Sequence, residues 1–143
     1  TLNGGENPFV DVDGHIFVTP GDRMPGVARH KLKASVTHDI TERWSLGASA
    51  VYSDGQYLYG DEANQNAKTS DFTVVNLSSS YQVTPKVQIY GAVENLFDED
   101  YETFGTFSPV DEVPIAEVPG ISNPRSLSPA APRAIYAGLR LRL

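Results

Sequence analysis

The sequence predicts an all-β chain whose antiparallel strands follow one another up and down, as in a transmembrane β-barrel. Three observations favour this fold. Five segments alternate between apolar and polar residues, which is the periodicity of strands with two different faces. The connections between these segments alternate between short and long. No run approaches the roughly 18 apolar residues of a transmembrane helix, so any membrane crossing would depend on strands.

The first two strands are expected over residues 30–40 and 44–53, separated by a tight polar turn. In each, apolar residues occupy every second position, while Lys, Ser, Thr, Gly and Asp occupy most of the others. One face is therefore expected to be apolar. Its side chains are Leu32, Ala34, Val36 and Ile40 in the first strand, and Trp44, Leu46, Ala48, Ala50 and Tyr52 in the second.

Three further strands are expected over residues 75–83, 87–94 and 133–143. A turn containing Pro85 separates the first two, because proline presets its φ angle and ends the hydrogen-bonding ladder. The residues grouped on one face are Val75, Leu77, Ser79, Tyr81 and Val83, then Val87, Ile89, Gly91 and Val93, and finally Ile135, Ala137, Leu139, Leu141 and Leu143.

The organisation expected along the chain has four parts. Residues 1–29 hold a weak sixth strand, from His15 to Thr19, and a turn-rich loop. Residues 30–97 hold four strands, residues 98–131 form a long extracellular loop rich in proline and acidic residues, and residues 132–143 form the closing strand. Compact domains rarely carry a loop of this length.

Connection lengths and residue types point to lipid on the apolar face. Connections of about three or four residues near Thr41 and Pro85 alternate with connections of about fifteen to thirty residues near Gly60 and Pro114, as in outer-membrane barrels. The polar face suits a wet lumen. Aromatic residues lie near strand ends, where interfacial girdles need them. On pattern alone, a soluble β-sandwich acting as a non-enzymatic ligand-binding module remains an alternative. The aromatic residues are Trp44, Tyr57, Tyr59, Tyr81 and Phe97.

Composition excludes several classes of protein. The net charge is −7 and the eleven Lys and Arg residues are scattered, so nucleic-acid binding is not expected. The absence of cysteine excludes disulfides and thiolate metal sites. The chain begins with Thr1 and has no charged-then-apolar leader, from which we expect a processed or excised segment.

Three ordered motifs identify a family. The run Val93-Glu94-Asn95-Leu96-Phe97-Asp98-Glu99-Asp100-Tyr101 closely resembles the "NLFD..Y" motif on the penultimate strand of TonB-dependent receptors. About thirty residues later, Pro132-Arg133 and the alternating strand to Leu143 resemble the closing strand of that family, which usually ends in phenylalanine. Upstream, the segment from Pro20 to Val27 and the pair Arg29-His30 are similar to an earlier loop and strand entry.

The resemblance implies the C-terminal five to six strands of a barrel of about 22 strands. It also implies partners: the remaining strands and the plug domain of the same receptor, the TonB energy-transducing system acting through the plug, the barrel assembly machinery at the last strand, outer-membrane lipid and a small-molecule ligand. The implied function is active transport of a scarce nutrient across the bacterial outer membrane. A ferric siderophore is the commonest ligand in the family.

No catalytic, metal or cofactor site is expected. Asp11-Val12-Asp13-Gly14 begins like a calcium loop but lacks the later ligands, and the three histidines, His15, His30 and His38, share no ligand spacing. No serine lies in a nucleophile motif, so an enzyme is not expected. A structural role is expected for Asn95, Leu96, Phe97, Asp98, Tyr101, Pro132, Arg133 and Leu143, while ligand-binding residues cannot be assigned. The acidic Asp111, Glu112 and Glu117 are expected to solvate the long loop.

Overall fold

The computed structural model describes residues 1–110 and 123–142, which form two compact units. The sheet unit is made of residues 30–53, 72–100 and 131–143, and the loop unit of residues 1–29, 54–71 and 101–130. The acidic residues Asp111, Glu112 and Glu117 and the terminal Leu143 lie outside the described residues. No helix in the described part of the chain is long and apolar enough to cross a membrane.

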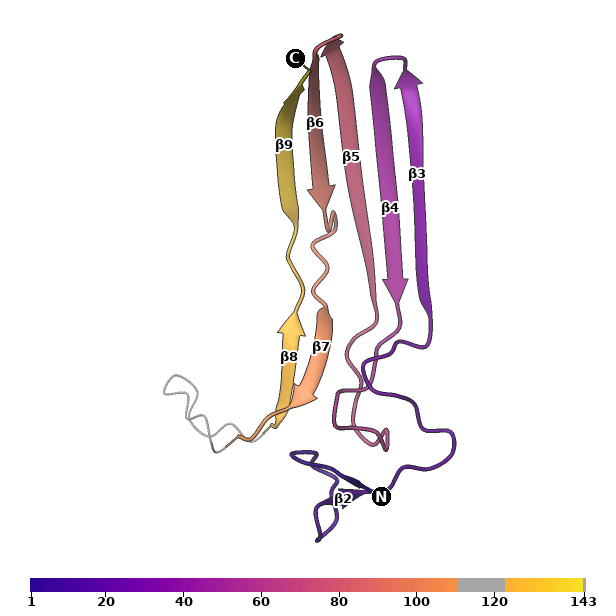
Figure 1. Ribbon diagram of the computed structural model, residues 1–143, viewed down its shortest axis with the longest axis vertical. Coiled ribbons are helices and arrows are strands. Elements are labelled where there is room, and N and C mark those ends of the chain that lie inside the picture. The colour runs from indigo at the N-terminus through magenta and orange to yellow at the C-terminus, as the bar shows by residue number, and fades with distance from the viewer. Residues whose placement is uncertain (111–122, 143) are drawn as a thin grey trace. The chain divides into compact units, whose positions relative to one another are not determined.

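The sheet unit is a single antiparallel sheet of five strands in the order β3-β4-β5-β6-β9 (Figure 1). All five strands that the alternation predicts are present. Two-residue turns join β3 to β4 and β5 to β6, and a bulge precedes each turn, between Asp39 and Thr41 and between Gln82 and Thr84. The strands are β3 (Lys31–Thr41), β4 (Trp44–Ser53), β5 (Phe72–Thr84), β6 (Val87–Glu94) and β9 (Ala134–Leu141).

The strand register confirms the two expected faces. Val36 lies opposite Ala48, Ala48 opposite Leu77, Leu77 opposite Val93, and Val93 opposite Ile135, so one row of apolar residues crosses all five strands. The neighbouring row on the other face is small and polar apart from its last member. It consists of Thr37, Gly47, Ser78, Ala92 and Tyr136. A shift of one residue in any strand would exchange its faces, so the alternation excludes such shifts from this register.

The weak strand expected over His15–Thr19 is present but shorter, and it lies outside the five-stranded sheet. Only His15–Ile16 forms a strand (β2), and it pairs with β1 (Leu2–Asn3) in the loop unit, not with the five-stranded sheet. The alternating segment before Pro20 is too short to specify a place in a large sheet. Ile16 is buried within the loop unit instead.

The expectation of an irregular loop over residues 98–131 was incomplete. The described part of this segment contains an antiparallel hairpin of β7 (Glu102–Phe107) and β8 (Arg125–Pro129). The prolines of the segment do not prevent the pairing, because Pro124 precedes β8 and Pro129 is its last residue, where a missing N–H does not interrupt the ladder.

Candidate functional site

The apolar face of the sheet leaves most of its large apolar side chains exposed. Soluble proteins rarely expose large contiguous apolar patches, because water disfavours them, whereas hydrocarbon accepts them. The strands β3, β4 and β5 have ten to thirteen residues, which is enough to cross an apolar slab when tilted, whereas β6 and β9 have eight each. The large side chains exposed on this face are Leu32, Val36, Ile40, Trp44, Leu46, Leu77, Tyr81, Val83, Ile89, Ile135, Leu139 and Leu141, and Ile135 is 76% exposed.

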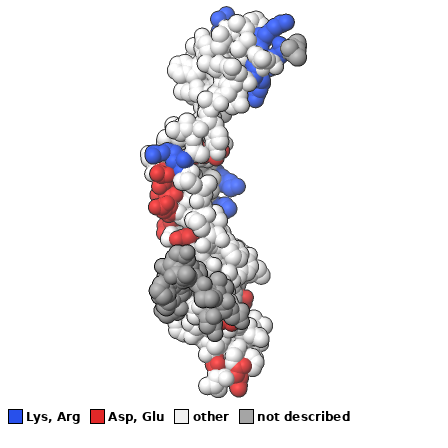
Figure 2. Space-filling view, turned by 90° about the vertical axis from the view of Figure 1, so that its left-hand side faces the viewer, with Lys and Arg blue, Asp and Glu red and all other residues white. Residues whose placement is uncertain are grey.

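Amphipathic aromatic residues border this face at the end with the short turns. Trp44 pairs with Tyr81, and the Trp44 indole Nε1 donates to the Ser79 hydroxyl at 3.0 Å. Basic side chains gather at the same end, at the top of Figure 2, where Arg43 and Lys86 occupy the two turns. At the boundary between hydrocarbon and lipid headgroups, membrane proteins commonly place Trp and Tyr side chains, with Lys and Arg side chains further towards the water. The residues at this end of the sheet follow that arrangement.

His38 is the one histidine on the apolar face, where it lies opposite Leu46. His15 belongs to the loop unit. His38 lines a groove of about 480 Å³ over the small residues Ala48 and Gly91.

The polar face of the sheet is lined by hydroxyls and a few charges. Shallow cavities of about 310 and 350 Å³ lie over Gly47, Ser78 and Ala92, where the side chains are smallest. Arg140 bounds one cavity, donating from Nη1 to Gln88 at 3.1 Å, and Glu94 bounds the other. This surface combines hydroxyl and charged side chains with small and aromatic ones such as Ala92 and Tyr90.

The two C-terminal motifs of the sequence meet in one cluster at the end of β6. Asn95 is 4% exposed and has a positive φ of 50°. Its side-chain Nδ2 donates to the carbonyls of Glu99 (2.9 Å) and Ala131 (3.3 Å), and its Oδ1 accepts from the Glu99 N–H at 2.8 Å. The Asn95 N–H donates to Oδ1 of Asn76 on β5 at 2.9 Å. One side chain thus satisfies backbone groups on both sides of the long connection.

Asp98 and Arg133 extend this cluster. The Arg133 N–H donates to Asp98 Oδ1 at 2.8 Å, and the guanidinium Nη2 lies 3.7 Å from Oδ2. Both side chains are about half exposed, so the ion pair is screened by solvent. We call Asn95, Asp98 and Arg133 the motif clamp, because they join the segment that leaves β6 to the segment that enters β9.

The other motif residues lie outside the clamp. The Leu96 N–H donates to the Val75 carbonyl on β5, and Phe97 is 70% exposed. Tyr101 belongs to the loop unit, where its carbonyl accepts from the Ala130 N–H. Pro132 is exposed.

A buried polar network that the sequence did not reveal organises the loop unit. Asp61 is fully buried, and its carboxylate accepts from the backbone N–H groups of Gln65 and Asn66, both at 2.9 Å, and from Asn66 Nδ2 at 3.0 Å. Asn7, also buried, donates to the Gly60 carbonyl at 2.7 Å. The network therefore ties the N-terminal segment to residues 60–66. No local pattern predicts the contact of Asn7 with Asp61, because these two residues lie 54 positions apart.

The segment that begins like a calcium loop forms an exposed turn. Asp11, Asp13 and His15 place their ligand atoms within 4.8 Å of one another. Oδ1 of Asp11, however, accepts from the backbone N–H groups of Asp13 (2.9 Å) and His15 (2.8 Å). The His15 N–H is the main cause that lowers the pKa of the Asp11 carboxyl. These contacts account for the arrangement as a turn.

Comparisons with known proteins agree with the geometry of the sheet. A family model described as "TonB dependent receptor-like, beta-barrel" matches residues 10–96. The vitamin B12 transporter BtuB of Photobacterium profundum is 35% identical over 69 residues, which cover 48% of this chain. The crystal structure of the ferric-catecholate import receptor Fiu from E. coli K12, in its closed form, covers 82% of this chain with a TM-score of 0.60 and 21% identity, so it shares the fold.

The chain spans only a small part of these relatives. The match covers 11% of the BtuB sequence and 14% of the Fiu chain.

Proposed function

The chain belongs to the TonB-dependent receptor β-barrel family, and from this membership we propose that it forms part of the wall and outer loops of a receptor that imports a scarce nutrient across the bacterial outer membrane. Ferric siderophore is the ligand class we propose, on its frequency in the family. The proposed activity is energy-driven transport, not catalysis.

The observation that carries this proposal is the sheet with one exposed apolar face and one polar face. Within the described residues, β3 pairs only with β4, and β9 only with β6. In hydrocarbon, each unpaired backbone group at such an edge would cost several kcal/mol, so strands from the rest of the receptor must pair with both edges. The apolar face would then contact lipid and the polar face would line the lumen.

Family membership supports further partners as parts of the same proposal. A plug domain would fill the lumen and contact the TonB system, and the barrel assembly machinery would engage the strand that ends near Leu143. The long connections, including residues 98–131, would face the outside of the cell, because the short turns of such barrels lie on the periplasmic side. We also propose that the residues of the two C-terminal motifs act structurally, through the motif clamp.

Fractionation of source cells tests the proposal. An antibody against this segment is expected to detect, in the outer membrane, a band several times heavier than 15.5 kDa that shifts when the sample is boiled. Uptake of radiolabelled ferric siderophore should then require both the receptor and TonB. A band of about this chain's own mass in the soluble fraction, unaffected by boiling, would instead support a β-sandwich binding module.

A further inference from the structure

We infer that three segments of the loop unit open and close as one cooperative body: the N-terminal segment (residues 1–29), the central segment (residues 54–71) and the β7–β8 hairpin. Along the chain they are separate, because strands of the sheet unit lie between them. The central segment holds the other two together. The inference goes beyond the proposed transport and does not depend on which molecule is transported.

The central segment lies beside β7 and is hydrogen-bonded to it. The Tyr59 N–H donates to the Gly105 carbonyl at 2.9 Å, and Tyr59 forms a parallel β-bridge with Thr106. The side-chain Nε2 of Gln56 donates to the carbonyl of Thr103 at 3.0 Å. The central segment therefore bonds to β7 at several positions, through both backbone and side-chain groups.

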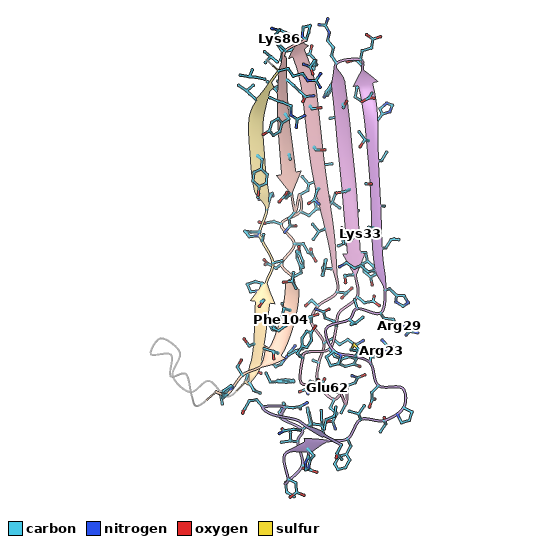
Figure 3. The ribbon with its side chains drawn as sticks, in the orientation of Figure 1. Arg23, Arg29, Lys33, Glu62, Lys86 and Phe104 are labelled. Carbon is cyan, nitrogen blue, oxygen red and sulfur yellow. The ribbon has the colours of Figure 1, made fainter. Side chains whose placement is uncertain are left out.

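A buried leucine of the central segment fits against a glycine of β7. Leu58 is fully buried, and a Cβ added at Gly105 would lie only 2.8 Å from Leu58 Cγ and 3.0 Å from Leu127 Cδ2. The ring of Phe104, labelled in Figure 3, stacks on that of Tyr59, with 5.2 Å between the ring centroids. The close approach of Leu58 to β7 thus requires glycine at position 105.

The later part of the central segment is bound to the hairpin as well. Arg125 Nη2, on β8, donates to the carbonyls of Ala67 (3.4 Å) and Lys68 (3.2 Å). The Ser70 N–H donates to Glu102 Oε2, on β7, at 3.2 Å. Both strands of the hairpin are therefore tied to the central segment.

The N-terminal segment is bound to the same central segment at three places. The Gly26 N–H donates to the Tyr57 carbonyl at 2.9 Å. The N–H of Arg23, labelled in Figure 3, donates to Asn64 Oδ1 at 2.6 Å, and Asn64 Nδ2 donates back to the Arg23 carbonyl at 2.9 Å. The third place is the buried polar network that contains Asn7. Several hydrogen bonds would therefore have to break before this segment could leave.

Four consecutive residues of the central segment couple the two sides. The carbonyls of Tyr57 and Gly60 accept hydrogen bonds from the N-terminal segment. The two residues between them, Leu58 and Tyr59, contact the β7–β8 hairpin. One short stretch of backbone thus holds both neighbours, so displacing it on one side releases the other. Opening of such a structure is expected as a single cooperative step.

Hydrogen exchange, measured by mass spectrometry on the intact receptor in outer-membrane vesicles, tests the inference. Gly105→Ala presses a Cβ against Leu58 on the hairpin side, and Asn7→Ala removes the buried amide on the N-terminal side. Overpacking or the loss of a buried hydrogen bond should speed opening by about 5- to 30-fold. Each variant should therefore speed exchange by the same factor in residues 4–16, in residues 57–69 and in the hairpin, while exchange in the sheet stays unchanged.

The matched controls are Thr103→Ala and Asn3→Ala, at exposed side chains of β7 and of the N-terminal segment, and neither should speed exchange across the three segments. A hairpin unaffected by Asn7→Ala, or residues 4–16 unaffected by Gly105→Ala, would overturn the inference. If a variant loses the heat-modifiable band, the wild type decides instead. In increasing urea, the three segments should share one opening free energy and one urea dependence, and different values would also overturn the inference.

Discussion

The sheet unit and the loop unit place their apolar residues in opposite ways. Of the three buried apolar side chains in the described part of the chain, Ile16 and Leu58 lie in the loop unit and only Val74 in the sheet unit, although the sheet carries most of the exposed large ones. The loop unit combines these two buried apolar side chains with the buried polar network of Asp61 and Asn7. The sheet is suited to a different solvent on each face.

The two units also differ in charge. The segments of the sheet unit hold seven basic and six acidic residues, whereas those of the loop unit hold four basic and twelve acidic residues. The net charge of −7 therefore arises from the segments of the loop unit and not from those of the sheet unit. The mean hydropathy of the whole chain does not reveal the apolar face of the sheet, and its net charge does not show that the acidic residues are concentrated in the loop unit.

The largest effect is expected from a charge on the apolar face of the sheet. Leu77→Lys places an ammonium near the middle of β5, which should cost about 2–4 kcal/mol if that face contacts hydrocarbon. The heat-modifiable receptor band should be strongly depleted. Ser78→Lys, at the same depth on the polar face, is the matched control and should assemble. Equal assembly of both variants would contradict the assignment of the two faces.

The next largest effect concerns the motif clamp. Asn95→Ala removes the side-chain amide that donates to the backbone carbonyls of Glu99 and Ala131. Leaving these carbonyls unpaired should lower the free energy of unfolding by about 1–3 kcal/mol. The temperature at which the folded band is lost on unboiled gels should fall. Asn95→Gly tolerates the positive φ and so separates the side-chain contribution from that of the backbone. Wild-type stability in both variants would show that the clamp is dispensable.

A smaller and local effect is expected in the loop unit. Asp61→Ala removes the acceptor of four hydrogen bonds, so the loops should open about 1–2 kcal/mol more easily, while the sheet stays folded. Protease added to whole cells should cleave near residues 60–66, with the heat-modifiable band unchanged. Glu62→Ala is the neighbouring control. Loss of the band in the Asp61 variant would show that the loops also support the sheet.

The smallest effect is expected for the exposed ion pair. Arg133→Gln removes the guanidinium but keeps the backbone N–H that donates to Asp98, so the stability of the sheet should change by only about 0–1 kcal/mol. Asp98→Ala removes the acceptor as well and should be more destabilising. Thermal loss of the folded band measures both variants. A larger effect at Arg133 than at Asp98 would contradict the hydrogen-bond account.

Sequence reasoning succeeded where the structure is periodic. The alternation in β3, β4, β5, β6 and β9 predicted the strands and the face of each residue, because side chains of a strand alternate whatever its neighbours are. It over-extended the strand over residues 15–19 and was incomplete over residues 98–131. The strands in these segments have only two to six residues, so local pattern could not tell which partner strand each would choose.

The contacts within the loop unit could not be predicted from the sequence for a different reason. Tyr59 meets Phe104, and Asn7 joins the network of Asp61, across 45 and 54 positions of irregular chain. The motif clamp joins Asp98 to Arg133 across 35 positions. The motifs were visible separately as a family resemblance, but their contact was not.

By itself, the sequence determined the fold class, the two faces of the sheet, the alternation of short and long connections and the family. All of these follow from periodicity and from residue order along one strand. Only the tertiary structure decided that the motifs form a clamp, that Asp61 is the centre of a buried network, and that two loop aromatics stack in the open. These contacts depend on where irregular segments return in space, which no repeating pattern encodes.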